Sequence, residues 1–168
     1  MSEDYSEIDG ELRKMGYKPI DTCRKTRKIE LVYHGAVLSK KNRHIVSKQG
    51  SIIPDKKARA NENDIICQFT DQLKKMKIVD AFVMTKQEQI MRAQSHDARY
   101  KLAFLVYRAN EIRRDLDNQL NTLLDALVAS FAIPDDSCKF VKQIIIADKG
   151  VDKQNPRVEV EITISEET

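Results

Sequence analysis

The stretch Arg-Arg-Asp-Leu-Asp-Asn, residues 113–118, places two carboxylates two residues apart at the start of the most clearly amphipathic segment of the chain. In that segment, residues 116–131, large apolar side chains recur at helical spacing along one stripe: Leu116, Leu120, Leu123, Leu124, Leu127 and Phe131. A second acidic pair, Asp135-Asp136, follows just beyond its end. The pattern predicts a helix with carboxylates at both ends, and we expect the two acidic pairs to meet in space.

Three or four carboxylates held together repel one another, so a cluster of them needs a positive charge to offset the repulsion. Mg²⁺ is the usual cation for such an all-oxygen site. Phosphodiester hydrolysis needs this arrangement, because the metal neutralises the phosphate and lowers the pKa of an attacking water. The alternative is purely structural: Asp115 caps the helix, Asp117 interacts with the helix dipole, and Asp135-Asp136 form an ordinary turn.

The segments around this helix predict an α+β fold of two layers in the order β-α-β-α-β-β, with a mixed sheet and a C-terminal antiparallel hairpin. Strands are expected where β-favouring residues gather or apolar residues alternate, at residues 28–38, 99–109, 140–147 and 157–164. A second helix is expected to begin at Pro54-Asp55. The remaining segments are interpreted as an N-terminal extension (1–27), a basic loop (39–53) and an insertion (80–97) within a domain spanning 28–168.

Length and composition suit one globular domain: the chain has 168 residues, of which 41% are hydrophobic. No apolar run approaches the roughly 18 residues that span a bilayer, and the acidic N-terminus lacks a signal-peptide core. The three cysteines are scattered without a CxxC pair, which favours a reducing cytoplasm over a disulfide framework or zinc site. No glycine-rich phosphate loop or Ser/His or Cys/His nucleophile motif is present, so neither a nucleotide cofactor nor covalent catalysis is expected.

Basic residues concentrate between Arg13 and Arg59, where only Asp21, Glu30 and Asp55 oppose them. A polyanion such as DNA is drawn to such a region, because binding releases condensed counterions. The alternative is a solvated basic surface.

Together these motifs resemble the RusA-type Holliday-junction resolvases, or crossover junction endodeoxyribonucleases. In that family the motif Arg-x-Asp-x-Asp-Asn is followed by an Asp-Ala-Leu helix, here Asp125-Ala126-Leu127, and by an Asp-Asp pair. The likeness is strongest over residues 113–136 and extends over 31–164, and Ser39 to Arg43 resembles the family's Ser-x-Asn segment. It implies a homodimeric, Mg²⁺-dependent endonuclease, with Mn²⁺ as the other candidate metal. Such an enzyme cuts opposing strands of four-way DNA junctions during recombination and repair in a bacterial or phage-infected cell.

Carried over by position, the resemblance makes Asp115, Asp117 and Asp136 the catalytic metal-binding carboxylates and Asp135 a secondary ligand. Asn118 would support the turn. The residues expected to contact DNA phosphates are Lys40, Lys41, Asn42, Arg43, Arg113 and Arg114.

One position departs from the family pattern. Members commonly carry a lysine four residues after the second Asp of the motif, where this chain has Asn121. On a helix Asp117 and Asn121 are neighbours, so the lost cation would cost on the order of 10²–10³ in rate unless another replaces it. The candidates are Lys139, Lys142 and Lys149. Two further readings stay open: a branched-DNA-binding protein of the same fold with weak or no cleavage, and an α+β interaction domain whose acids only cap a helix.

Overall fold

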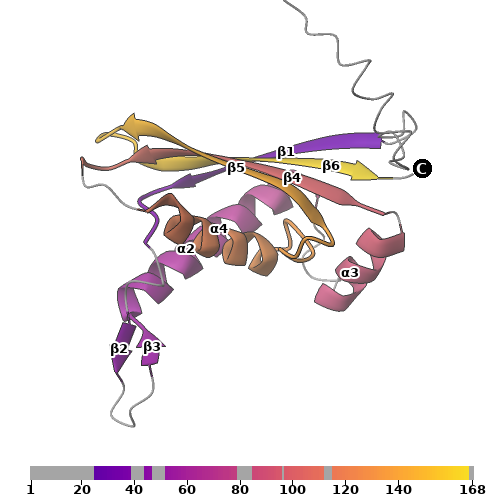
Figure 1. Ribbon diagram of the computed structural model, residues 1–168, viewed down its shortest axis with the longest axis horizontal. Helices are drawn as coiled ribbons and strands as arrows, with labels where there is room; N and C mark the ends of the chain where they lie inside the picture. The colour runs from indigo at the N-terminus through magenta and orange to yellow at the C-terminus, as the bar shows by residue number, and fades with distance from the viewer. Residues whose placement is uncertain are drawn as a thin grey trace, which may run out of the picture.

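A four-stranded sheet with helices on one of its faces forms the body of the protein in a computed structural model (Figure 1). The structure describes residues 25–38, 44–46, 52–78, 85–95, 97–111 and 115–166. The sheet contains β1 (Lys25–His34), β4 (Arg99–Arg108), β5 (Val141–Val151) and β6 (Arg157–Glu166), in the order β1-β6-β4-β5. β6 runs antiparallel to both β1 and β4, whereas β4 and β5 are parallel. The predicted two-layer α+β fold with a mixed sheet is therefore confirmed.

The two C-terminal strands differ from the expected hairpin in their pairing. They run in opposite directions, but β4 lies between them, so β6 pairs with β4 and β1 and not with β5. The connection through α4 explains the difference. A helical crossover lets β5 lie parallel to β4 on one side, so β6 pairs with the other side of β4. Burial agrees with this order: alternate residues of β6 are buried, whereas most of β5, at the edge, is exposed.

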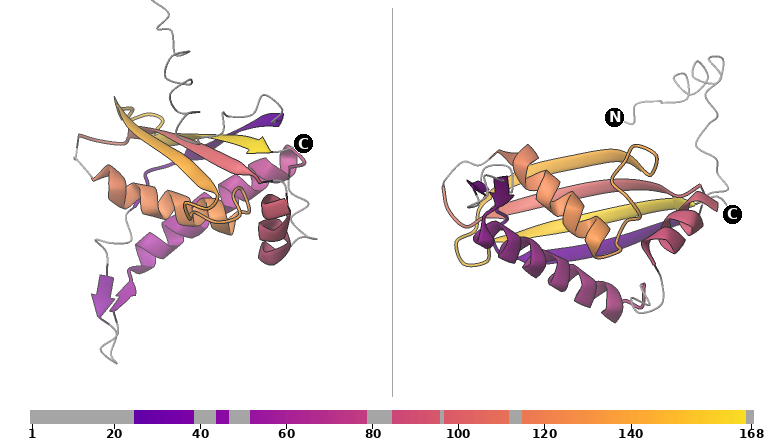
Figure 2. Two further views of the ribbon diagram at one scale, coloured as in Figure 1. Left: turned by 45° about the vertical axis from the view of Figure 1, so that its right-hand side comes forward. Right: turned by 90° about the horizontal axis from the view of Figure 1, so that it is seen from below.

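Helices α2 (Lys56–Lys75) and α4 (Leu116–Ala129) cover the same face of the sheet (Figures 1 and 2). The core lies between them and the strands, and its largest fully buried side chains come from both layers: Leu31, Ile65, Phe69, Leu73, Leu102, Phe104, Leu123, Leu127, Ile133 and Ile162. No described helix is long and apolar enough to cross a membrane.

The predicted start of the second helix is confirmed to within a residue or two. Pro54 closes the short strand β3 (Ile52–Pro54), which pairs with β2 (His44–Val46) inside the segment expected to be a loop. Asp55 is the N-cap residue of α2, and its carboxylate accepts a hydrogen bond from the backbone N–H of Lys57 at 3.1 Å. This is the capping role that an aspartate ordinarily plays at a helix start.

β1 begins at Lys25, so its first three residues belong to the segment assigned to the N-terminal extension. Residues 1–24, the remainder of that predicted extension, lie outside the described part of the chain. β1 and β6 pair over ten residues, from Lys25 opposite Glu166 to His34 opposite Arg157.

Residues 80–97, interpreted as an insertion, contain the helix α3 (Lys86–Ser95). Thr85 and Glu88 form a capping box at its start: Glu88 Oε2 accepts from Thr85 N at 2.5 Å, and Thr85 Oγ1 accepts from Glu88 N at 3.2 Å. The hydrogen bond from the Thr85 backbone lowers the pKa of the Glu88 carboxyl. Ala93 is buried in the core and Ile90 packs against it, so α3 is an integral part of the domain.

Candidate metal and DNA site at the ends of helix α4

Asp115 occupies the N-cap position of α4, but its side chain does not cap the helix. Its backbone is extended (φ −66°, ψ 121°) and its side chain makes no capping hydrogen bond. The exposed carboxylate instead accepts from the side-chain amide of Asn118 at 3.2 Å. Asp55, in the same position on α2, does cap its helix. Neither oxygen of the Asp115 carboxylate accepts a hydrogen bond from the backbone N–H groups of α4. This weakens the purely structural interpretation of Asp115, in which its side chain caps the helix.

Asp117 lies exposed in the first turn of α4, where the helix dipole favours a negative charge. One turn further on, the exposed Asn121 donates from its side-chain amide to the carbonyl oxygen of Asp117 at 2.8 Å. The amide is thus engaged with the backbone of its own helix, a common arrangement for a short polar side chain. Asn121 therefore brings no positive charge to this end of α4.

The second acidic pair lies beyond the other end of α4. The helix ends at Ala129, two residues earlier than predicted, and Phe131 adopts a left-handed conformation with φ of 62°. After the turn, half-buried Asp135 and exposed Asp136 line a cleft of about 330 Å³. The other residues of that cleft are Lys86, Asp125, Val128, Ala129 and Phe131.

Helix α3 holds this turn in place. The side-chain Nε2 of Gln89 donates to the carbonyl oxygen of Phe131 at 2.7 Å. The other amide atom, Gln89 Oε1, is buried without a hydrogen-bond partner among the described residues. The capping box Thr85-x-x-Glu88 could have revealed this helix from sequence, but its contact with Phe131 depends on the tertiary fold.

The two acidic pairs do not meet within one chain. α4 has 14 residues, and at about 1.5 Å of rise per residue it spans about 21 Å. Asp115 and Asp117 stand at one end of it, and Asp135 and Asp136 follow the other. Within the residues that the structure describes, no group of three or more Asp, Glu, His or Cys side chains is placed to hold a metal ion. The expectation that the pairs come together in a single chain is therefore wrong, although their role as metal ligands stays a prediction.

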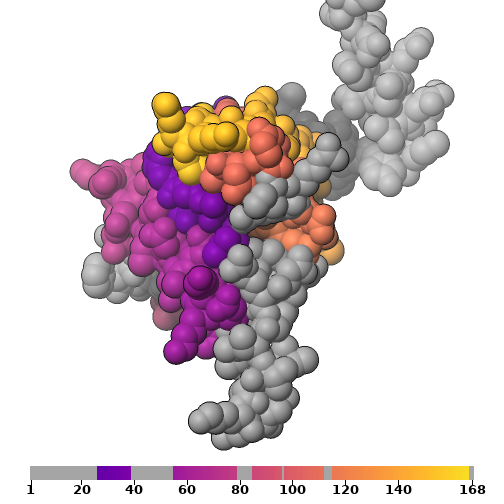
Figure 3. Space-filling model, turned by 90° about the vertical axis from the view of Figure 1, so that its left-hand side faces the viewer, coloured from indigo at the N-terminus to yellow at the C-terminus, as the bar shows by residue number. Residues whose placement is uncertain are grey.

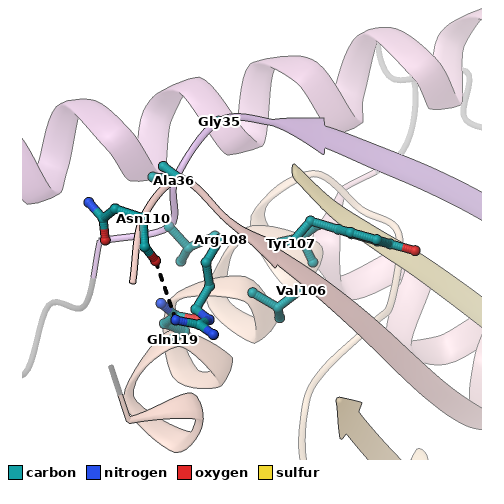
Figure 4. A pocket seen from close by; sticks show the side chains of 10 residues that line it. Gly35, Ala36, Val106, Tyr107, Arg108, Asn110 and Gln119 are labelled. Carbon is teal, nitrogen blue, oxygen red and sulfur yellow. Dashed lines mark hydrogen bonds between the residues drawn. The ribbon is translucent and has the colours of Figure 1, made fainter. Parts of the chain in front are cut away.

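Two residues near the Asp115 end were not singled out from the sequence. Arg108, the last residue of β4, pairs through Nε with the Asp148 carboxylate at 3.0 Å. It also donates from Nη1 to the carbonyl oxygen of Asn110 at 3.3 Å (Figure 4). These contacts join β4 and β5 to the chain that leads toward α4. The Gly150 backbone N–H and then the Arg108 guanidinium lower the pKa of Asp148. The pairing of Arg108 with Asp148 across β4 and β5 has no signal in the local sequence.

Gln119 lines the same small pocket as Arg108 (Figure 4). Its side chain is only 4% exposed, and its Oε1 has no hydrogen-bond partner in the described part of the chain. The pocket holds about 20 Å³, which is enough for one water molecule.

The candidate DNA-contacting residues Lys40, Lys41, Asn42, Arg43, Arg113 and Arg114 lie outside the described residues. Leu38, the last described residue before Lys40, is bonded to both α4 and α2. Its carbonyl accepts from Thr122 Oγ1 of α4 at 3.3 Å, and its N–H donates to Asn61 Oδ1 of α2 at 2.8 Å. The described chain thus ends beside α4, two residues before Lys40. Figure 3 faces this end of the molecule, with the end of β1 in indigo, the beginning of α2 in magenta and α4 in orange.

The three candidate compensating lysines divide between the two ends of β5. All three are exposed. Lys139 and Lys142 lie at its start, with the Asp135-Asp136 pair, and Lys142 Nζ donates to the carbonyl oxygen of Cys138 at 2.8 Å. Lys149 lies near the end of β5, beside the last residues of β4. Within one chain, Lys149 is therefore the candidate at the same end as Asp115 and Asp117.

Comparison with protein families gives a match over most of the chain. The model of the family described as endodeoxyribonuclease RusA matches residues 34–163. The matched range runs from the end of β1 into β6, and so includes α2, α4 and both acidic pairs. No curated protein matches the chain.

Proposed function

The chain belongs to the endodeoxyribonuclease RusA family, and we propose that it is a metal-dependent nuclease that resolves four-way DNA junctions as a homodimer. The family implies a nuclease that acts on branched DNA. Three finer elements belong to the proposal: the metal, the paired cuts and the two-chain assembly. Each of them is supported by the way in which α4 places the aspartates.

The position of Asp115 is the observation that carries the proposal. Its carboxylate is exposed at a helix start and does not cap the helix, while Asp55 does so at the corresponding place on α2. Asp117 is exposed in the adjoining turn. Two carboxylates that are accessible and unused by the backbone are suitable oxygen ligands for a hard divalent cation. Mg²⁺ bound there would neutralise phosphate charge and lower the pKa of the attacking water.

The separation of about 21 Å along α4 supports a site made by two chains. Asp136 of one chain cannot reach a cation held by Asp115 and Asp117 of the same chain, because metal–oxygen bonds are only about 2 Å long. A two-fold dimer places equivalent surfaces of two copies against each other, so that Asp136 of one copy can complete the site of the other. It also provides two sites, as symmetric cleavage of a four-way junction requires.

In such a site the residues divide the work between them. Asp115 and Asp117 would hold the cation from the start of α4, and Asp136 would complete its ligands from the partner, with Asp135 as a secondary ligand. Leu38, which lies beside α4, is two residues before Lys40 in the sequence, so Lys40, Lys41, Asn42 and Arg43 are proposed to hold the phosphate backbone near the metal. Arg113 and Arg114, which directly precede Asp115, are proposed to do the same.

The second candidate function is binding of branched DNA with little cleavage. It is favoured by Asn121, whose amide is engaged with the Asp117 carbonyl and carries no charge. In that case the fold recognises the junction, but nothing stabilises the charge that develops on the phosphate in the transition state.

One cleavage experiment separates these functions. A labelled four-way junction and a matched linear duplex are incubated with the wild type in Mg²⁺, in Mn²⁺ and in EDTA. Asp117→Asn and Asn121→Lys are run in parallel, with Asp71→Asn as the control, since Asp71 is an exposed aspartate on α2. The proposal predicts paired, metal-dependent cuts in the junction that Asp117→Asn abolishes and the control retains. Tight binding without cuts, with cutting gained in Asn121→Lys, supports the binding protein instead. A chain that neither binds nor cuts the junction contradicts both.

A further inference from the structure

The two edges of the sheet, β1 and β5, differ in whether side chains of a helix occupy their backbone hydrogen-bonding groups. At the β1 edge, the side chain of Gln72 donates to the Val32 carbonyl oxygen at 2.7 Å and accepts from the Val32 N–H at 2.9 Å. Gln68 makes the same pair of bonds with His34, at 3.2 and 3.0 Å. Two glutamines of α2 thus occupy the backbone groups that a further strand would need, which is one way to protect an edge.

In the described part of the chain no side chain of a helix covers the backbone of the β5 edge, although near the end of β5 the Gly150 N–H donates to Asp148 Oδ1 at 2.9 Å. β5 has 11 residues and stands last in the sheet, with β4 on its inner side (Figure 2). Three consecutive isoleucines occupy its middle, and Ile144 and Ile145 are 39% and 51% exposed. A long apolar edge strand is a template for pairing with another chain.

We propose that β5 pairs with β5 of a second copy of this chain, antiparallel about a two-fold axis at Ile145. The two four-stranded sheets then form one continuous sheet. The inference rests on the proposed dimeric nuclease and specifies the surface that joins its two halves. The occupant is a second copy because the β5 sequence is complementary to itself in the antiparallel direction.

In this register, opposing residues of the two strands are equally far from Ile145 in the sequence, one before it and one after it. Lys142 then lies opposite the partner's Asp148, and the symmetry axis repeats this pair. Ile144 lies opposite the partner's Ile146, and Ile145 opposite its own equivalent. Opposite charges and apolar residues facing each other across strands stabilise the pairing. This register pairs nine of the eleven residues of β5, whereas the other antiparallel self-register that places a lysine opposite an aspartate, Lys149 with Asp148, pairs only six.

The same pairing brings the two half-sites together. α4 leads from the end of β4 back to the start of β5, so Asp115 and Asp117 lie at the end where β5 finishes, and Asp135 and Asp136 lie where it begins. In an antiparallel pair, the start of one β5 adjoins the finish of the other. Asp136 of one copy therefore stands at the same end of the joint sheet as the partner's Asp115 and Asp117, which no contact within a single chain achieves.

The test is the mass of the protein in solution, measured by sedimentation without DNA or metal. The wild type is expected to be a dimer. Ile145→Lys puts two like charges face to face on the axis, and is expected to give a monomer whose circular dichroism is unchanged. The control Met91→Lys, at a residue 55% exposed on α3, should remain a dimer. Lys142→Glu alone should weaken the dimer at least tenfold, and adding Asp148→Lys should restore it. A wild-type monomer, or a dimer that Ile145→Lys leaves intact, overturns the inference.

A cross-link tests the register even if a charged variant folds poorly. In a background with Cys23→Ser, Cys67→Ser and Cys138→Ser, oxidation of Ile145→Cys should yield a covalent dimer, because opposing strand residues lie within disulfide distance. Ala147→Cys should not, since its equivalent is four residues away along the partner strand. Equal cross-linking of the two, or none at Ile145→Cys, overturns the register.

Both the sedimentation and the cross-linking measurements are independent of nuclease activity. An inactive Asp117→Asn chain that still dimerises through β5 would separate the interface from the proposed chemistry.

Discussion

Gln89 of α3 donates from Nε2 to the carbonyl oxygen of Phe131 at 2.7 Å, and this bond ties the segment between α2 and β4 to the turn that precedes the second acidic pair. The contact places α3 against the cleft that Asp135 lines, because Phe131 lies four residues before Asp135 in the same cleft.

Gln89→Ala is therefore expected to reduce cleavage more than junction affinity. Loss of the hydrogen bond costs about 1 kcal/mol of unfolding free energy. A small displacement of a ligand-bearing turn can cost about tenfold or more in rate. Gln94→Ala, at an exposed position of the same helix, is the control and should behave like the wild type. Thermal unfolding and single-turnover cleavage measure the two effects, and an unchanged cleavage rate in Gln89→Ala would show that the turn needs no support from α3.

Asp55 and Asp115 occupy equivalent places on their helices, so their substitutions should have opposite consequences. Asp55→Ala removes a capping bond and is expected to lower the unfolding free energy by about 1 kcal/mol without loss of cleavage. Asp115→Ala removes no capping bond and is expected to abolish cleavage with a smaller effect on stability. Denaturant unfolding and the junction assay would be made on both proteins. A large loss of stability in Asp115→Ala, with cleavage retained, would return Asp115 to a structural role.

Asn121→Lys should raise the cleavage rate, because it introduces a cation one helical turn from Asp117. Charge stabilisation of this kind is worth on the order of 10²–10³ in rate where no other cation acts. Asn63→Lys makes the same substitution at an exposed position of α2 and serves as the control. Equal rates for the wild type and Asn121→Lys would indicate that one of Lys139, Lys142 and Lys149 already supplies the charge.

Stability is expected to fall above pH 10. Burial raises the pKa of Tyr33 and of Tyr100 to about 12, from an ordinary value of 10.0. The folded state favours the neutral phenol. The contribution of these two phenols to the free energy of unfolding is therefore complete below pH 10, and it is lost as the pH rises through the folded-state pKa near 12. Denaturant unfolding between pH 9 and pH 12 should show the decline, and Tyr100→Phe should make it shallower. An identical slope in Tyr100→Phe would rule out ionisation of Tyr100 as a cause.

Sequence reasoning succeeded where one segment carries its own signal. The apolar stripe of α4, the Asp55 start of α2 and the alternation of β6 each predict an element that the structure contains. The capping box of Thr85 and Glu88 is an equally local signal, for the start of α3. Asp115 shows the limit of such signals. Its position before an apolar stripe suits both a cap and a metal ligand, and only the conformation shows that its carboxylate makes no capping hydrogen bond.

The relationships between segments were predicted less well. The alternation in residues 157–164 indicates a strand but not its neighbours, and β6 lies between β4 and β1 because β5 occupies the other side of β4. The distance between the acidic pairs follows from the length of α4, which keeps its two ends apart. Arg108 and Asp148 meet only because β4 and β5 are parallel neighbours.

The central claim, that two chains share each set of carboxylates, is tested most directly by mixing two inactive variants. Asp117→Asn and Asp136→Asn are each expected to be unable to cut a four-way junction in Mg²⁺. After subunit exchange, a mixed dimer has one site with both substitutions and one site with neither. The account predicts that the mixture regains metal-dependent nicking of the junction, one strand at a time. If each site were built within a single chain, both sites of every mixed dimer would carry one substitution, and a mixture that forms mixed dimers yet stays inactive would contradict the account.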